Sequence, residues 1–304
     1  MNNFTRFIHR SVIKSNLEEF FVTLRKRLNF IRQFIPPSIR HKVGSVGRFI
    51  PHPSSYPPED DYLLTRGNTR FRINRSDYVQ WRLFYGVRDN YLLEAMKAVT
   101  ANSIVLDIGA NFGAFSLRLA SYVLKKKLSR VQIHSFEPNP AAVLRLRENL
   151  MLNTQLGNIV HIHAFGLGNE KTKLPFQLNS VNSGASRIIG TEHGASIHIE
   201  IDRVDDVVKT IDPDNISFIK MIVEGYEPQV FKGAVNSIKR FRPPIFFEVT
   251  PGWYSEHGTN LSAILSQLKD LGYSFFGEVH NDLIPYDPLK FDPMIQFNMF
   301  AIVK

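Results

Sequence analysis

The residues best placed to do chemistry stand where two apolar runs end. Asp107 closes the first run, Gly109 and Gly113 follow it in a short turn, and Glu137 closes the second run. This layout predicts a nucleotide-type pocket at the carboxyl ends of two neighbouring parallel strands. The glycines permit a tight turn and close backbone approach to a ligand. Glu137 is placed to accept two hydrogen bonds from ribose hydroxyls.

The glycine spacing decides which nucleotide-type ligand is expected. A dinucleotide enzyme would carry Gly-x-Gly-x-x-Gly to cradle a pyrophosphate, and this chain lacks that pattern. Residues 107–113 instead read Asp-x-Gly-x-x-x-Gly, which resembles the first motif of class I methyltransferases. The resemblance implies S-adenosylmethionine, a ligand without a phosphate, as the cofactor. The predicted cofactor-binding residues are Asp107, Gly109, Ala110, Asn111, Gly113, Glu137 and Pro138.

Each of these residues also has a purely structural interpretation. Asp107 either holds the loop and contacts the amino end of the cofactor, or only caps the following turn. Asn111 tolerates a left-handed backbone and either presents its amide to the ligand or serves the turn alone. Glu137 is either the ribose acceptor or a surface acid at a strand end, and Pro138 stiffens the loop that presents it.

Strand and helix patterns alternate after the first hundred residues, which predicts an α/β fold with a mostly parallel sheet. The last two strands are joined by a polar, proline-containing loop without a helix, so the last strand is expected to be antiparallel. This is the Rossmann-like form of class I methyltransferases. The expected strands are 104–108, 131–136, 160–164, 218–223, 245–249, 274–279 and 298–303. The expected helices include 91–99, 115–124, 141–152, 229–238 and 261–271.

Composition narrows the class of protein. The chain has 304 residues, 43% apolar and 21% charged, as in ordinary globular proteins. It has no cysteine, so disulfides and thiolate ligands are excluded. No apolar run is long enough for a membrane span, no secretory signal is evident, and a cytoplasmic location is expected. No cluster of His, Asp and Glu has the spacing of a metal site.

The charge is concentrated in the first of three zones. Residues 1–50 hold ten Lys and Arg against Glu18 and Glu19, out of a net charge of +9 for the chain. Their apolar residues recur at helical spacing, which predicts a basic amphipathic helix that binds an anionic membrane surface or packs on protein. The proline-rich residues 51–75 suggest a linker or surface loop. The nearly neutral residues 76–304 make nucleic acid an unlikely partner.

From about Asp77 onward the chain resembles the FkbM-type methyltransferases, which methylate hydroxyl oxygens on sugars and natural products. The most specific matching block is Ile-Lys-Met-Ile-Val-Glu-Gly-Tyr-Glu at 219–227. Other matches are 106–113, 136–140, 148–153, 182–186 and 242–248. The resemblance implies an S-adenosylmethionine-dependent O-methyltransferase domain at 76–304. The family pattern carries an aspartate where this chain has Ile222, so a carboxylate is missing near the meeting point of cofactor and acceptor.

The remaining polar residues of this region are the candidates for catalysis. Lys220 lies within an apolar strand, and Glu224 either pairs with it in a structural ion pair or meets the acceptor hydroxyl. Glu248 ends the fifth strand at the same rim, whereas Glu227 is expected to stabilise the start of a helix. His257, in the loop after this strand, is the one histidine that is a candidate base, and its alternative is a merely solvated loop histidine. Trp253 and Tyr254 either wall a pocket or pack, and 182–186 form a rim loop.

Three classes of function follow from these patterns. The leading class is an O-methyltransferase acting on a small molecule or a glycan. The second is a cofactor-binding but inactive interaction protein, as Ile222 suggests. The third is a methyltransferase docked to a membrane or nucleic acid through residues 1–50.

Overall fold

The computed structural model describes residues 51–58, 60–86, 89–254, 260–279, 282–291 and 295–303. The predicted amphipathic helix in residues 1–50 and His257 lie outside these ranges. The described residues form two compact units, each treated by itself below. The smaller contains 51–64, 72–86 and 180–182, and the larger contains 65–71, 89–179 and 183–303, apart from the gaps given above.

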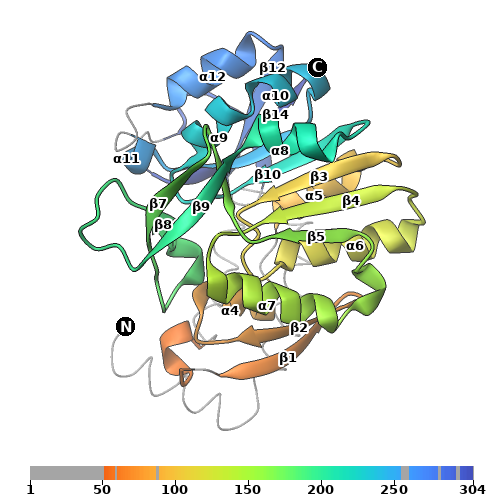
Figure 1. Ribbon diagram of the computed structural model, residues 1–304, viewed down its shortest axis with the longest axis vertical. Helices are drawn as coiled ribbons and strands as arrows, with labels where there is room; N and C mark the ends of the chain where they lie inside the picture. The colour runs from red at the N-terminus through yellow and green to blue at the C-terminus, as the bar shows by residue number, and fades with distance from the viewer. Residues whose placement is uncertain are drawn as a thin grey trace. The chain divides into compact units, whose positions relative to one another are not determined.

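An eight-stranded sheet forms the centre of the larger unit, with strand order β13-β12-β14-β11-β10-β3-β4-β5 (Figure 1). Strands β11, β10, β3, β4 and β5 are parallel, and β14 runs antiparallel to both β11 and β12. The predicted mostly parallel sheet with an antiparallel last strand is therefore confirmed, and all seven expected strands are present. The bounds are β3 Ser103–Ile108, β4 Val131–Phe136, β5 Val160–His163, β10 Ile216–Met221, β11 Ile245–Val249, β12 Tyr273–Val279, β13 Asp282–Pro285 and β14 Phe297–Val303.

The central strands are buried on both faces. Every residue of β3 and of β10 is buried, including Leu106 and Met221, which have no exposed surface. Burial of both faces favours a continuous apolar run over an alternating one, which is why these strands stand out in the sequence.

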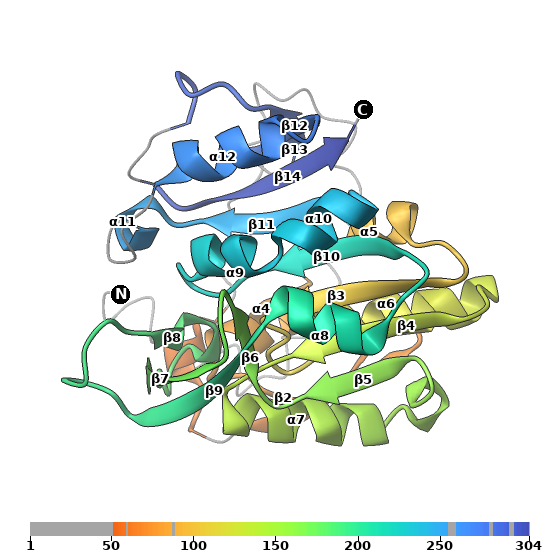
Figure 2. The ribbon, with the colours of Figure 1, turned by 45° about the horizontal axis from the view of Figure 1, so that its top comes forward.

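Helices cover both faces of this sheet. In both ribbon views α5 and α6 lie behind it, whereas α8, α9 and α10 lie in front (Figures 1 and 2). The bounds are α5 Asn90–Ala98, α6 Ala114–Lys126, α7 Pro140–Met151, α8 Val204–Ile211, α9 Glu227–Gly233, α10 Val235–Phe241, α11 Pro251–Tyr254 and α12 Leu261–Lys269, with short 3-10 turns η3 Thr154–Leu156 and η4 Ser183–Ala185.

The helix expected at 229–238 is two helices. They meet at Ala234, whose φ of −105° and ψ of 6° are not helical. A Cβ on the preceding Gly233 would lie 1.8 Å from the carbonyl oxygen of Gly168. Close packing of this segment against a neighbouring strand accompanies the break, and the sequence pattern carries no signal of that contact.

A second sheet, of four strands in the order β6-β9-β7-β8, belongs to the same unit. Sequence reasoning missed it, because its strands are short or only partly buried. The bounds are β6 Gly166–Gly168, β7 Thr172–Gln177, β8 Arg187–Ile188 and β9 Ile197–Arg203.

Two paired strands occupy much of the segment for which a linker or surface loop was expected, and that expectation is corrected here. They are β1 (Asp61–Arg66) and β2 (Thr69–Asn74). Phe71 and Ile73 are fully buried and alternate with exposed arginines, while Gly67 takes a φ of +59° in the turn. The prolines and aspartates around the strands obscured this alternation.

The smaller unit contains the turn η2 (Pro53–Ser55) and the helix α4 (Tyr78–Tyr85). Asp77 caps α4, and its side chain accepts a hydrogen bond from the N–H of Gln80 at 3.0 Å. Across all the described ranges, no helix is both long and apolar enough to cross a membrane.

Candidate functional site

The predicted site residues meet at one edge of the large sheet. Strands β11, β10, β3 and β4 are parallel neighbours, so their carboxyl ends lie side by side. The chain runs outward from β3 to β5 in one direction and through β10 and β11 in the other, which makes the β3–β10 boundary a topological switch point. Ligands of open α/β sheets bind at this position.

The loop after β3 has a backbone that requires its glycines. Gly109 has a φ of +81°, and a Cβ there would lie 1.9 Å from the carbonyl oxygen of Ile222. Gly113 has a φ of +88°, and a Cβ there would lie 2.2 Å from a methyl carbon of Leu146. Asn111 takes the left-handed φ of 48° that was expected for it. The turn therefore has the tight geometry that the sequence predicts.

Glu137 ties this loop to the loop after β4. One carboxylate oxygen accepts the N–H of Asn111 at 2.8 Å, and the other accepts the N–H of Asn139 at 2.9 Å. The residue is only 7% exposed, and Pro138 beside it is half-buried. Burial raises the pKa of the Glu137 carboxyl, while the two backbone bonds and the Lys220 ammonium oppose that rise. Glu137 is thus a buried structural acceptor rather than a surface acid.

Asp107 and Lys220 form a buried ion pair beneath the loop. The Lys220 ammonium lies 3.0 Å from one Asp107 oxygen and donates to the carbonyl of Gly109 at 2.5 Å. The other Asp107 oxygen accepts from the Ser116 hydroxyl at 2.5 Å. Among the described residues the ion-pair partner of Lys220 is Asp107, and the alternative Lys220–Glu224 pair is not formed. Asp107 holds the loop from below, and Ser116 is a partner that sequence reasoning did not identify.

The turn after β10 carries the second candidate, Glu224. Glu224 and Gly225 both have positive φ, 55° and 96°, and such a backbone is strained for a glutamate. The fully buried Glu227 fixes this turn, because its two carboxylate oxygens accept the N–H groups of Val223 and Gly225 at 2.9 and 3.0 Å. Glu227 does begin α9, but its carboxylate binds the preceding turn, which was not predicted.

Burial and neighbouring acidic side chains raise the pKa values of Glu224 and Glu227 around this turn. The pKa of Glu224 rises to about 9, first because it is buried and then because Glu248 and Glu227 lie near it. Burial and Glu248 likewise raise the pKa of Glu227 to about 8. Glu248 is half-buried near the end of β11. Glu224 and Glu227 therefore retain their protons at neutral pH, which ordinary glutamates lose.

The rim of the site contains a cation that sequence reasoning missed. The Arg187 guanidinium lies 4.8 Å from the ring centroid of Trp253, and its charge lowers the pKa of Glu224. The 182–186 loop, expected at the rim, reaches the first motif through Ser183, whose hydroxyl lies 3.2 Å from the Asn111 amide nitrogen. Arg187 directly follows this loop in the sequence. That position is the only feature of the sequence from which its place at the rim could have been predicted.

Ile222 directly follows β10 and lies between Lys220 and Glu224 in the sequence. Its N–H donates to the carbonyl of Ile108 at 3.0 Å, and its own carbonyl faces Gly109. Its side chain is half-buried. These backbone contacts of Ile222 join the loops after β3 and β10, and they do not depend on the side chain at position 222. Among the residues that the structure describes, no group of three or more His, Asp or Glu side chains is arranged to hold a metal.

The chain is similar to known methyltransferases. The model of the FkbM methyltransferase domain matches residues 107–275, more than half of the chain. The methyltransferase sdnD of Sordaria araneosa is 28% identical over 162 residues, 44% of this chain and 61% of that protein. The hexuronic acid methyltransferase AglP of Haloferax volcanii is 23% identical over 172 residues, 56% of this chain and 66% of that protein. The chain thus spans somewhat less than two thirds of either relative.

A crystallised FkbM methyltransferase of Methylobacillus flagellatus matches 94% of this chain and 60% of its own, with 16% identity and a TM-score of 0.45. The family model covers both loops that Glu137 joins, the Glu224 turn and Glu248. The family match therefore implies a methyl donor. This chain belongs to the FkbM methyltransferase family.

Proposed function

We propose that this protein transfers a methyl group from S-adenosylmethionine to a hydroxyl oxygen of a sugar, glycan or natural product. One observation carries the proposal: Glu137, which joins the loops after β3 and β4, lies at the same carboxyl-end edge of the sheet as the turn after β10 that presents Glu224. A hexuronic acid methyltransferase among the similar proteins supports a sugar-type acceptor.

The acceptor groups of the β3–β4 loops fit S-adenosylmethionine. A carboxylate can accept about four hydrogen bonds, and Glu137 uses two of them for Asn111 and Asn139. Its remaining capacity suits the two hydroxyls of a ribose, and it suits no phosphate, because two anions would repel. Asp107, Gly109, Ala110, Gly113 and Pro138 shape the loops around it. When bound, S-adenosylmethionine supplies a methyl group on a sulfonium and leaves as a neutral thioether.

Glu224 is the proposed proton acceptor for the hydroxyl. The forming O–CH₃ bond releases the hydroxyl proton, which passes to the Glu224 carboxylate, while Glu248 contacts the acceptor at the same rim. General-base assistance of this kind contributes roughly 10²–10⁴-fold to a rate. Because only the ionised form accepts a proton and its pKa is about 9, the turnover rate should rise with pH and level off near pH 9. In Glu224→Gln that rise should disappear.

For Lys220 we propose a positioning role. Its ammonium is bonded to Asp107 and to the Gly109 carbonyl, so it acts on the ligand through the loop. Orienting the reactants is itself worth roughly 7–11 kcal/mol in favourable cases.

The test uses the full chain, S-adenosylmethionine with an isotopically labelled methyl group, and a panel of uronic acids, neutral glycans and hydroxylated natural products. Mass spectrometry should find the label on a hydroxyl oxygen of at least one acceptor class, and Glu224→Gln should reduce its transfer. Label found only on nitrogen or carbon would contradict the O-methyltransferase proposal. Addition of uronic acids and neutral sugars in separate reactions identifies the acceptor class.

A second candidate, cofactor binding without turnover, rests on Ile222. An isoleucine at this position cannot accept a proton, and its half-buried side chain lies where the family pattern has an acid. If it replaces a working carboxylate, Ile222→Asp should increase methyl transfer, since Lys220 lies two residues away to offset the new charge. If the isoleucine belongs to the working site, the same change should lower both turnover and melting temperature. Inactivity of both forms with intact cofactor binding favours the second candidate.

A further inference from the structure

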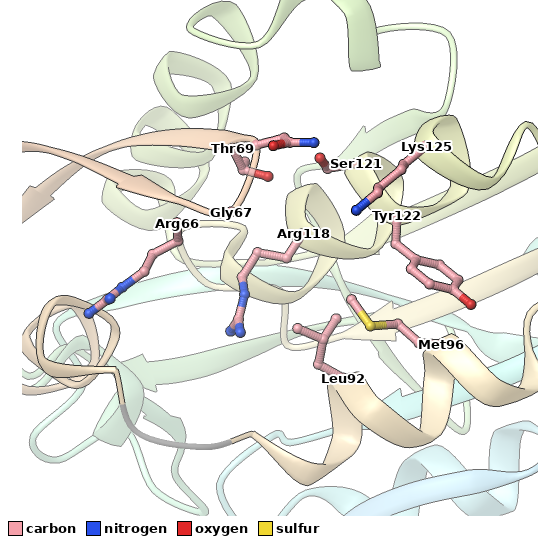
Figure 3. A pocket seen from close by; sticks show the side chains of 10 residues that line it. Arg66, Gly67, Thr69, Leu92, Met96, Arg118, Ser121, Tyr122 and Lys125 are labelled. Carbon is pink, nitrogen blue, oxygen red and sulfur yellow. The ribbon is translucent and has the colours of Figure 1, made fainter. Parts of the chain in front are cut away.

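A cavity of about 310 Å³ lies in the larger unit, away from the carboxyl-end site. Three elements line it: the β1–β2 turn, one face of α5 and one face of α6 (Figure 3). Its volume is at the lower end of the range for small-molecule pockets. The lining residues are Arg66, Gly67, Asn68, Thr69, Leu92, Met96, Arg118, Ser121, Tyr122 and Lys125.

Helical spacing explains why four of these side chains come from one face of α6. Arg118, Ser121, Tyr122 and Lys125 stand at positions i, i+3, i+4 and i+7 of α6, which places them on one face of the helix. Leu92 and Met96, four residues apart on α5, form the apolar wall. The cavity therefore has a cationic and hydroxyl-bearing side on α6 and an apolar side on α5.

Positive charge exceeds negative charge in this cavity. Arg66 and Arg118 extend their guanidinium groups in the same direction (Figure 3). Burial, then the charge of Arg118, lowers the pKa of Arg66 to about 10, while Asp89 opposes that fall, so Arg66 stays protonated at neutral pH. Asp89 lies 2.5 Å from Arg118 and offsets one charge. In the part of the chain that the structure describes, the exposed Lys125 has no ion-pair partner.

Hydroxyl groups add neutral donors to the same cavity. Thr69 and Ser121 contribute them, whereas the Tyr122 hydroxyl points away from these two (Figure 3). Guanidinium forks bind phosphate oxygens with two parallel hydrogen bonds, and lysine adds a point charge. Among the lining residues, all of them described, there are three cations and no carboxylate; with the hydroxyls of Thr69 and Ser121 they match a doubly charged anion with several acceptor oxygens better than a single carboxylate.

We infer that this cavity is a binding site for a phosphate group, carried by a small molecule that packs against Leu92 and Met96 or present as inorganic phosphate. The site is separate from the methyl-transfer site, which uses the first turn of α6 near Gly113 and Ser116, whereas the cavity uses the rest of the helix from Arg118 to Lys125. The inference does not depend on the proposed methyl acceptor.

The test is calorimetric titration of the full chain with inorganic phosphate and with glucose 6-phosphate, at constant ionic strength and with sodium acetate as the monoanion control. Lys125→Gln and Arg66→Gln should each weaken phosphate binding by about tenfold or more, the effect of losing one charged hydrogen bond. Lys127→Gln is the matched control, because it removes the same charge from the neighbouring C-cap of α6 and does not line the cavity. It should leave binding unchanged.

The titrations distinguish a phosphate ester from inorganic phosphate as the ligand. Tighter binding of glucose 6-phosphate than of inorganic phosphate identifies a phosphate ester as the ligand, and equal binding identifies the phosphate group alone. The site is refuted if acetate binds as well as phosphate, or if Lys127→Gln weakens binding as much as Lys125→Gln. RNA binding without saturable phosphate binding also refutes it and indicates a nucleic-acid surface instead. Unchanged melting temperatures of the variants show that each is folded.

Discussion

At the scale of single residues, two glutamates perform the same task on opposite sides of the candidate site. Glu137 accepts two backbone N–H groups from the loops after β3 and β4, and Glu227 accepts two from the turn after β10. In the tight turns these backbone N–H groups have no backbone carbonyl as acceptor, and the two glutamate side chains accept their hydrogen bonds in place of water. The chain thus uses buried carboxylates to fix the loops on which Asn111 and Glu224 stand.

The raised pKa of Glu224 makes a prediction about stability and pH. An unfolded glutamate ionises near pH 4.5, whereas folded Glu224 holds its proton until about pH 9. Between these values the folded state binds more protons, so its free energy of unfolding should fall as pH rises. Urea denaturation at several pH values should show this fall in the wild type and a smaller one in Glu224→Gln. Equal slopes in the two proteins would mean that Glu224 ionises normally.

The buried pair of Asp107 and Lys220 predicts a large loss of stability in Lys220→Met. Removing one partner leaves an uncompensated buried carboxylate, at a cost of about 3–5 kcal/mol. The exposed pair of Lys173 and Glu200 is the matched control, since Lys173→Met should cost less than about 1 kcal/mol. Urea midpoints measure both variants. Similar losses would show that the Lys220 pair is not buried as described.

At the scale of elements, the loops after β3 and β10 are joined through their backbones. Gly109→Ala should therefore lower the melting temperature far more than Gly272→Ala. Both glycines have nearly the same φ, +81° and +84°, but a Cβ meets the Ile222 carbonyl at Gly109 and nothing within 4 Å at Gly272. The left-handed backbone alone costs about 1–2 kcal/mol in either variant. An equal decrease in the two variants would rule out the close approach.

The elements also show what the sequence can and cannot predict. The strands at 131–136 and 245–249 were located to the residue: Ile245–Phe247 is a continuous apolar run, and the apolar residues Val131, Ile133 and Phe136 are followed at once by Glu137-Pro138, which ends the strand. β13 was missed, since it is partly exposed, ends in Pro285 and exists through its pairing with β12. Sequence reasoning placed Asp107, Lys220, Glu224 and Glu248 at one sheet edge. It did not predict which charges pair, because pairing depends on contacts across strands.

At the scale of the whole molecule, the excess positive charge and the match to the FkbM family lie in different segments of the chain. The FkbM match begins at residue 107, whereas most of the net charge belongs to residues 1–50, outside the described residues. The amphipathic helix expected there stays a prediction, as does its partner, a membrane surface or a protein. A basic segment gains about 1 kcal/mol per Lys or Arg near an anionic surface.

A vesicle experiment tests the membrane version of that prediction. The full chain should co-sediment with vesicles that contain anionic lipid and less with vesicles of neutral lipid. Replacing Arg25, Lys26 and Arg27 by glutamine should weaken the association, and replacing the exposed Lys209, Lys232 and Lys239, an equal charge outside the segment, should not. If the first triple substitution leaves vesicle association unchanged, the membrane version is wrong, and binding to a protein partner is the remaining prediction for residues 1–50.

The most direct test of the central claim is calorimetric titration of the full chain with S-adenosylmethionine. Wild type and Glu200→Gln, which changes an exposed acid, should bind it with equal affinity. Glu137→Gln should weaken binding by about tenfold or more, because the ribose loses a charged acceptor worth roughly 1.5–3 kcal/mol. Equal affinity in Glu137→Gln, or tighter binding of a nicotinamide dinucleotide than of S-adenosylmethionine, would contradict the assignment of the cofactor site.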